Sequence, residues 1–139
     1  MAAVLKLLSA ALLLHLLATG TCPSLFPSRG AAFLRTHSQR CDLSSVQVQQ
    51  TNTGRKVGYD PVFQVEVKNL CRCTITNVFL RSEGFASSAT VDPKLFRREG
   101  TGYLVNDGKG IPSSLSVKFR YAWDRAFRMS PASLQVNCW

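Results

Sequence analysis

The most regular hydrophobic pattern in the chain is an alternation with a period of two residues. It is clearest at 63–67 and 115–121, where apolar residues at every second position are separated by polar or charged ones. Residues 46–48 and 134–138 show the same alternation over shorter stretches. Successive side chains of a strand point to opposite faces, so this pattern is typical of strands with one buried face and one solvent-exposed face.

Turn-forming residues separate these segments. Glycines interrupt 51–60, residues 92–102 read DPKLFRREGTG, and Asn106-Asp107-Gly108 is a strong turn signal. We expect a further short strand at 86–91, a helical turn at 93–98, and a bulge near Asn77, where the alternation changes parity. About six short strands without a helical period predict an all-β fold, a small antiparallel β-sandwich or barrel.

The first 20 residues follow a different pattern. Lys6 precedes a mostly apolar run, and small residues stand at Ala18 and Gly20. This predicts a signal peptide at 1–20 and a secreted, extracellular protein. Residues 21–40 lack a period and are expected to form a flexible leader, followed by the β-domain at 41–139. No second long apolar run is present, so we expect no membrane span.

The chain is basic, with a formal net charge of +9 that falls to +8 if Lys6 is removed with the signal peptide. Such a charge favours acidic partners, among them acidic cell-wall polysaccharide and acidic protein surfaces. The basic residues are spread along the chain, and the secretory route argues against nucleic acid as a partner.

The chain contains five cysteines: Cys22, Cys41, Cys71, Cys73 and Cys138. Cysteines of secreted domains usually pair, and a bond between Cys71 and Cys73 would strain a very short ring. This leaves Cys41–Cys71 with Cys73–Cys138, or Cys41–Cys73 with Cys71–Cys138. No histidines accompany these cysteines, so no metal is expected. The fate of Cys22 stays open.

The sequence offers few residues that could carry out catalysis. After cleavage the one histidine is His37, in the leader, whereas acid-base and nucleophilic catalysis need an oriented titratable group. The carboxylates Asp60, Glu66, Asp92 and Asp107 fall at turns or on a solvent face of the predicted strands. We expect neither an enzyme nor a cofactor.

Three residues are conspicuous as binding candidates. Arg97-Arg98 is a dibasic pair in a predicted loop, either a protease cleavage site, a contact for an acidic receptor, or simply a solvated loop. Trp123 is open to three interpretations: core packing, a sugar-stacking platform, or an interface anchor, since aromatic residues and arginine dominate binding hot spots.

Taken together, the ordered motifs from about residue 41 to 138 resemble the plant tapetum determinant-like family of small secreted cysteine-containing signalling proteins. The residues that carry the resemblance are Cys41, Pro61, Phe63, Val65, Val67, Asn69, Cys71, Cys73, Gly84, Ser87, Ser88, Val91, Pro93, Phe96, Arg97, Arg98, Leu104, Val105, Asn106, Asp107, Gly108, Phe119, Tyr121, Ala122 and Cys138.

The chain departs from the family pattern at two positions. Glu83 and Tyr103 stand where relatives usually have cysteine. Our hypothesis is that those two cysteines pair with each other in relatives and that this chain lacks that bridge.

The resemblance implies a signalling ligand that binds the leucine-rich-repeat ectodomain of a plasma-membrane receptor kinase and specifies anther and tapetum cells. Fixed loops of a small basic domain would present shape and charge to the receptor. Our candidate contact residues are Arg97, Arg98, Asn106, Asp107 and Trp123. The alternative is an extracellular module that binds cell-wall polysaccharide through arginine, lysine and Trp123.

Overall fold

The computed structural model describes residues 40–139, so the predicted signal peptide, nearly all of the leader, Cys22 and His37 lie outside the described residues. The described part holds strands that all pair antiparallel and two short 3-10 turns. In chain order these are η1 (Leu43–Ser45), β1 (Val46–Val57), β2 (Asp60–Asn69), β3 (Thr74–Arg81), β4 (Phe96–Glu99), β5 (Gly102–Val105), η2 (Asn106–Gly108), β6 (Ser116–Ala122) and β7 (Ser130–Asn137).

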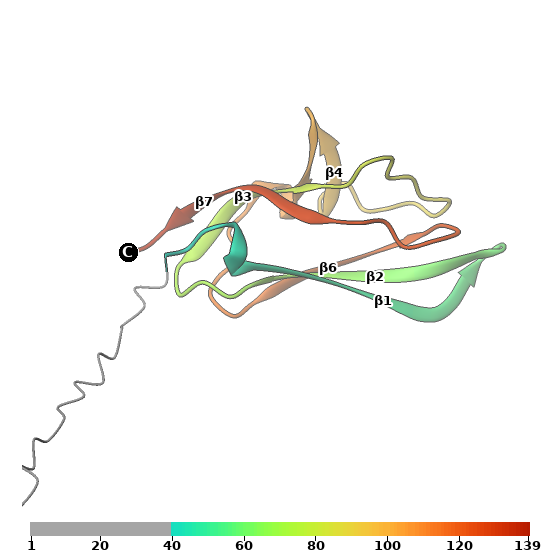
Figure 1. Ribbon diagram of the computed structural model, residues 1–139, viewed down its shortest axis with the longest axis horizontal. Coiled ribbons are helices and arrows are strands. Elements are labelled where there is room, and N and C mark those ends of the chain that lie inside the picture. The colour runs from blue at the N-terminus through green and yellow to red at the C-terminus, as the bar shows by residue number, and fades with distance from the viewer. Residues whose placement is uncertain (1–39) are drawn as a thin grey trace, which may run out of the picture. The chain divides into compact units, whose positions relative to one another are not determined.

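The strands form two sheets that face each other. One sheet has the order β1-β2-β6 and the other the order β4-β5-β3-β7. Figure 1 shows β1, β2 and β6 as one layer and β3 and β7 as the opposite layer, with β4 projecting at its edge. Of the two predicted architectures, the all-β sandwich is therefore the one confirmed. No helix among residues 40–139 is long and apolar enough to cross a membrane.

The three-stranded sheet follows the predicted alternation. Val65 and Val67 on β2 are fully buried, whereas Glu66 between them faces outward, 3.7 Å from the Lys118 ammonium on β6. Val65 lies opposite the buried Phe119 in the register. Each strand thus places its apolar residues on one face, where burial contributes about 25 cal/mol per Å² of apolar surface.

The four-stranded sheet is centred on β3, whose inner face carries Ile75, Val78 and Leu80. The pairing of β3 with β7 shifts register between Thr76 and Phe79, and Asn77 has a φ of 47°. The bulge predicted near Asn77 is confirmed. It explains why buried positions change parity, because the extra residue turns the following side chains to the other face.

Aromatic rings join the two sheets. Phe96 of β4 stacks on Phe119 of β6, with ring centroids 4.3 Å apart. Phe85, in the connection between β3 and β4, touches Phe96, Tyr103 and Tyr121 at centroid distances of 5.1, 5.4 and 5.3 Å. Edge-to-face and offset contacts of this kind add to the free energy of burying the rings.

Several predicted boundaries are wrong. Strand β1 continues to Val57 through the supposed break at 51–60, with an irregular register between Asn52 and Lys56. Residues 86–91 form no strand. The turn at 93–98 ends at Leu95, because Phe96–Glu99 is β4 and pairs with β5. The stretch 92–102 is therefore largely one arm and the bend of a β-hairpin.

Candidate functional site

The four cysteines of the domain form two bridges near each other. Cys41 is bonded to Cys71 and Cys73 to Cys138, with Cα–Cα distances of 5.3 and 4.8 Å. Of the two pairings left open by the sequence, the structure has the first. The sulfurs of Cys41, Cys71 and Cys73 lie within 4.8 Å of one another, but as disulfides they are not the thiolates that bind metals.

A buried asparagine organises the same end of the domain. Asn69 is fully buried, and its amide nitrogen donates to the carbonyl oxygens of Cys73 and Ile111, at 2.8 Å each. Its side-chain oxygen accepts a 2.8 Å hydrogen bond from the Cys71 N–H. The side chain thereby links the end of β2 to both bridges and to the loop before β6, and satisfies backbone groups that would otherwise be buried unpaired.

Three of the predicted contact residues lie near one another: Arg97 is on β4 and contacts Asp107, which with Asn106 belongs to the turn η2 directly after β5. The Arg97 guanidinium pairs with the Asp107 carboxylate at 2.5 Å and with that of Glu99 at 3.0 Å. The hydrogen bond and charge of Arg97 lower the pKa of Asp107 below its usual value. Arg97 and Asp107 are therefore largely paired with each other, which leaves less of their charge available to a partner.

The predicted Asn106-Asp107-Gly108 turn is confirmed as η2. All three residues have positive φ angles, of 55°, 55° and 73°. The positive φ favours glycine at Gly108, and a Cβ there would also push aside the exposed Asn77 side chain, whose oxygen would lie 2.6 Å away. The turn geometry is therefore reason enough for the Asn106-Asp107-Gly108 motif, apart from any role in binding.

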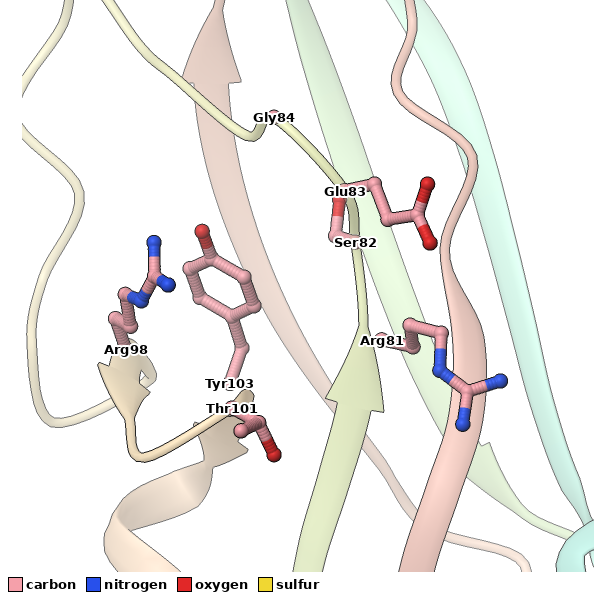
Figure 2. Close-up of a pocket in the computed structure, with 7 residues that line it drawn as sticks. All are labelled: Arg81, Ser82, Glu83, Gly84, Arg98, Thr101 and Tyr103. Carbon is pink, nitrogen blue, oxygen red and sulfur yellow. The ribbon is translucent and has the colours of Figure 1, made fainter.

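Arg98 is separated from its neighbour because the dibasic pair lies on a strand and not in a loop. Side chains alternate across a strand, so Arg97 and Arg98 point to opposite faces of β4. Arg98 is exposed and lines a hollow beside Tyr103, as Figure 2 shows. The expected loop position of this pair is wrong.

Trp123 follows the end of β6 and is only partly exposed. Its ring lies 6.2 Å from that of Phe127, and it packs against the buried core. Its backbone N–H donates to the Pro61 carbonyl at 3.3 Å. Among the interpretations left open, the geometry favours core packing and leaves only part of the ring for a partner.

Sequence reasoning missed the surface at the end of β3. Three hollows, of about 230, 450 and 290 Å³, all have Arg81 in their lining. A single arginine at the end of an apolar strand belongs to no recognisable sequence motif, so no local signal pointed to this surface. We call this region the Arg81 surface and define it by Arg81, Ser82, Glu83, Arg98, Thr101 and Arg128.

The two positions that depart from the family pattern both line the smallest hollow. In Figure 2 the Tyr103 ring occupies the hollow, while the Glu83 carboxylate points away from it. The bridge between cysteines at these positions in relatives stays a hypothesis.

Among the carboxylates considered for catalysis, Glu66 and Asp107 have lowered pKa values, the opposite of the raised pKa that a general acid needs. A hydrogen bond from Ser116 is the main cause that lowers the pKa of Glu66, and the Lys118 charge adds to it. The pKa of Asp107 is lowered by the hydrogen bond and charge of Arg97. Both groups are therefore ionised anions on the surface.

The fold and its surface define a class: a disulfide-bonded β-sandwich domain whose conspicuous chemistry is surface charge. The family model described as "Tapetum determinant 1, C-terminal" matches residues 42–138. This chain belongs to that family.

Curated relatives support the assignment. TPD1 protein homolog 1B of Oryza sativa subsp. japonica is 31% identical over 102 residues, which cover 72% of this chain and 60% of the relative. TPD1 protein homolog 1 of Arabidopsis thaliana is 31% identical over 103 residues, covering 72% and 56%. The chain therefore spans less than two thirds of the length of these relatives. No solved structure matches it.

Proposed function

We propose that this protein is a secreted, non-enzymatic signalling ligand that binds the ectodomain of a plasma-membrane leucine-rich-repeat receptor kinase and acts in anther and tapetum cell specification. The observation that carries the proposal is the family match over 42–138, nearly the whole described domain. The expected signal peptide supports export, and disulfides are stable in the oxidising compartments that it leads to.

The shape of the domain suits a ligand that is held rigid before it binds. Two bridges and the Asn69 network fix one end of the sheets, so the loops and strand ends need little ordering when they meet a receptor. A preordered surface loses less conformational entropy on binding, which raises affinity without added contacts.

The proposal is tested with protein secreted from eukaryotic cells with both bridges intact. We expect its N-terminus to begin at Thr21 and the protein to bind a leucine-rich-repeat receptor kinase ectodomain in surface plasmon resonance. Binding should saturate and persist at about 0.15 M salt, where exposed charges further apart than about 8 Å are screened. The matched control is a Cys73→Ser/Cys138→Ser variant. No binding to any such ectodomain would contradict the proposal.

The wall-binding alternative is favoured by the net charge of +9. Pectin should be included as a second analyte for this reason. The packing of Trp123 on Phe127 leaves it a poor platform for a sugar ring, so we expect pectin binding to fall steeply as salt is raised. Saturable pectin binding that resists salt would replace the receptor proposal.

A further inference from the structure

Three hollows meet around one side chain at the end of β3. The hollow of about 450 Å³ lies along the outer face of the β4-β5-β3-β7 sheet, with Phe79 and Gly102 among its lining. The hollow of about 230 Å³ lies beside Tyr103, and that of about 290 Å³ lies beside Arg128 of the connection to β7. Arg81 lines all three and so joins them into one continuous surface.

The charges of this surface are unevenly matched. Arg81, Arg98 and Arg128 are exposed, and none of the three has an ion-pair partner among residues 40–139. Glu99, which also lines the largest hollow, is already held by Arg97 at 3.0 Å. Glu83 is the remaining acidic group, so three unpaired cations stand against one anion.

A buried hydroxyl adds a second, independent feature. Ser82 is 5% exposed, and its Oγ has no hydrogen-bond partner among the described residues. Figure 2 shows its side chain on the same side of the chain as the Tyr103 ring, whereas Arg81 and Glu83 point the other way. Buried hydroxyls almost always have a partner, so an unpaired one beside a hollow is a donor that a ligand can satisfy.

We propose that the Arg81 surface is the contact surface for an acidic segment of a partner protein, whose Asp or Glu carboxylates are bound by Arg81, Arg98 and Arg128. Guanidinium groups bind carboxylates with two parallel hydrogen bonds, which gives direction as well as charge. That the partner is a receptor ectodomain rests on the function proposed above. The surface itself does not depend on that identity.

The geometry favours a protein partner over an acidic polysaccharide. Sugar rings are usually held on exposed aromatic faces, and Tyr103, at 8% exposure, offers little of its ring. The most exposed aromatic residues of the described part, Tyr59 and Trp139, line none of the three hollows.

The first experiment maps a probe of known chemistry. ¹⁵N-labelled, disulfide-bonded protein is titrated with a blocked hexapeptide of alternating Glu and Asp, in buffer of low ionic strength. We expect the largest amide shifts at 81–84, Thr101 and Ser130. Shifts spread evenly over all exposed arginines would overturn the proposal, because they would reflect general charge attraction.

Two triple variants make the test quantitative. One replaces Arg81, Arg98 and Arg128 with alanine. The matched control replaces Arg40, Arg55 and Arg72, which are also exposed, have no ion-pair partner among the described residues and line none of these hollows, so both variants lose the same charge. We expect the first to weaken peptide binding by about tenfold or more and the control by about twofold or less. Equal losses would overturn the proposal.

Two single variants refine the position of the ligand. Glu83→Gln removes the one opposing anion and should strengthen peptide binding by about twofold to threefold. Ser82→Ala removes the unpaired donor and should weaken binding while leaving the far-ultraviolet circular dichroism unchanged. A Glu83→Gln variant that binds more weakly would contradict the assignment of Glu83.

Parallel arms separate this inference from the proposed function. If the receptor ectodomain binds both triple variants equally, the surface is wrong and the receptor function stands. If no ectodomain binds but the peptide maps to the Arg81 surface, the receptor function fails and the surface stands. Oligogalacturonate of matched charge that binds the same surface as tightly as the peptide would overturn the choice of a protein partner.

Discussion

Strand β3 connects two ends of the sandwich that are stabilised in different ways. Cys73 immediately precedes it and Ser82 immediately follows it, nine residue steps away and so about 30 Å apart at the usual strand rise. At the first end, two bridges and the buried Asn69 side chain leave the surrounding backbone groups paired. At the second end lie an unpaired hydroxyl, unpaired arginines and three hollows.

This difference separates stability from recognition. A network of bridges and satisfied hydrogen bonds holds the sheets in register, so the opposite end can carry groups that cost stability in the free protein. Unpaired buried polar groups are features that natural domains usually avoid, and departures from such rules are expected chiefly at functional sites. The comparison predicts that substitutions at the two ends have opposite signs.

The largest effect should come from removing a bridge. Replacing Cys73 and Cys138 with serine opens a loop with a sequence separation of 65, and replacing Cys41 and Cys71 opens one of 30. The chain-entropy estimate gives losses of about 4 and about 3.5 kcal/mol in the free energy of unfolding. Urea denaturation of the two variants measures this. Losses under about 1 kcal/mol would show that the bridges do not stabilise this end of the sandwich.

Asn69→Ala should have the next largest effect. The substitution leaves the Cys71 N–H and the carbonyls of Cys73 and Ile111 without their side-chain partner in a fully buried site. We expect a loss of about 3 kcal/mol in unfolding free energy, since each unsatisfied buried group costs about 1–3 kcal/mol. The control is Asn52→Ala, which removes one exposed hydrogen bond from the Gly54 N–H and should cost well under half as much.

Ser82→Ala should act in the opposite direction. Its Oγ is buried without a partner among the described residues, so removing the hydroxyl should raise the unfolding free energy by about 1 kcal/mol. Thermal unfolding followed by circular dichroism measures the change. A loss of similar size would mean that the hydroxyl is satisfied in solution and that the two ends do not differ as described.

A double substitution, Glu83→Cys with Tyr103→Cys, tests the bridge that we infer for relatives. Both positions line one hollow, so we expect a disulfide between the new cysteines. Its stabilisation should be offset by the loss of the Tyr103 ring from its stack on Phe96, 4.8 Å away between centroids, leaving a net change within about 1 kcal/mol. Mass spectrometric mapping that joins these cysteines to others would reject the hypothesis.

The smallest effect concerns the Arg97–Asp107 pair. Because Arg97 lowers the pKa of Asp107, this carboxylate should titrate below 3.8, the ordinary value. The pair then contributes to stability above the ordinary value and loses that contribution as the pH falls through the lowered pKa. An NMR titration of the Asp107 carboxyl carbon measures this, with Arg97→Gln as the control that should restore the ordinary value. An unshifted titration in the native protein would show that the pair does not persist in solution.

Strands with one solvent-exposed face could be predicted from the sequence, as at 63–67 and 117–121, because alternate residues of these segments are apolar and packed inward. Leu115, the expected start of the second run, precedes β6 and is 56% exposed. The β4–β5 hairpin could not. Tyr103, Leu104 and Val105 are all buried and show no alternation, and FRRE looks like a turn until β5 pairs with it. Its position depends on tertiary contacts that propensity does not contain.

The false strand at 86–91 has a local cause. The Ser87 hydroxyl donates to the Ala89 carbonyl and accepts from the Ala89 N–H, at 2.7 and 3.2 Å. Short serine side chains that bond to nearby backbone compete with sheet hydrogen bonds. The segment instead docks on the end of β6, where the Ala122 N–H donates to Ser87 Oγ.

The candidate site was only partly predictable for a related reason. The sequence marks Arg97, Arg98 and the Asn106-Asp107-Gly108 turn, but strand geometry divides the arginines and pairing satisfies Asp107. Arg81 and Arg128 are 47 positions apart in the chain and line a single hollow only after β3 and β7 pair. No local pattern contains that juxtaposition.

Hydrogen–deuterium exchange of the intact secreted protein, with and without a leucine-rich-repeat receptor kinase ectodomain, tests the division between the two ends most directly. The account predicts that amides at 69–75 are strongly protected in the free protein and unchanged on binding, while those at 81–84 and around Thr101 and Ser130 gain protection. New protection confined to the disulfide end, with 81–84 unchanged in a saturated complex, would contradict it.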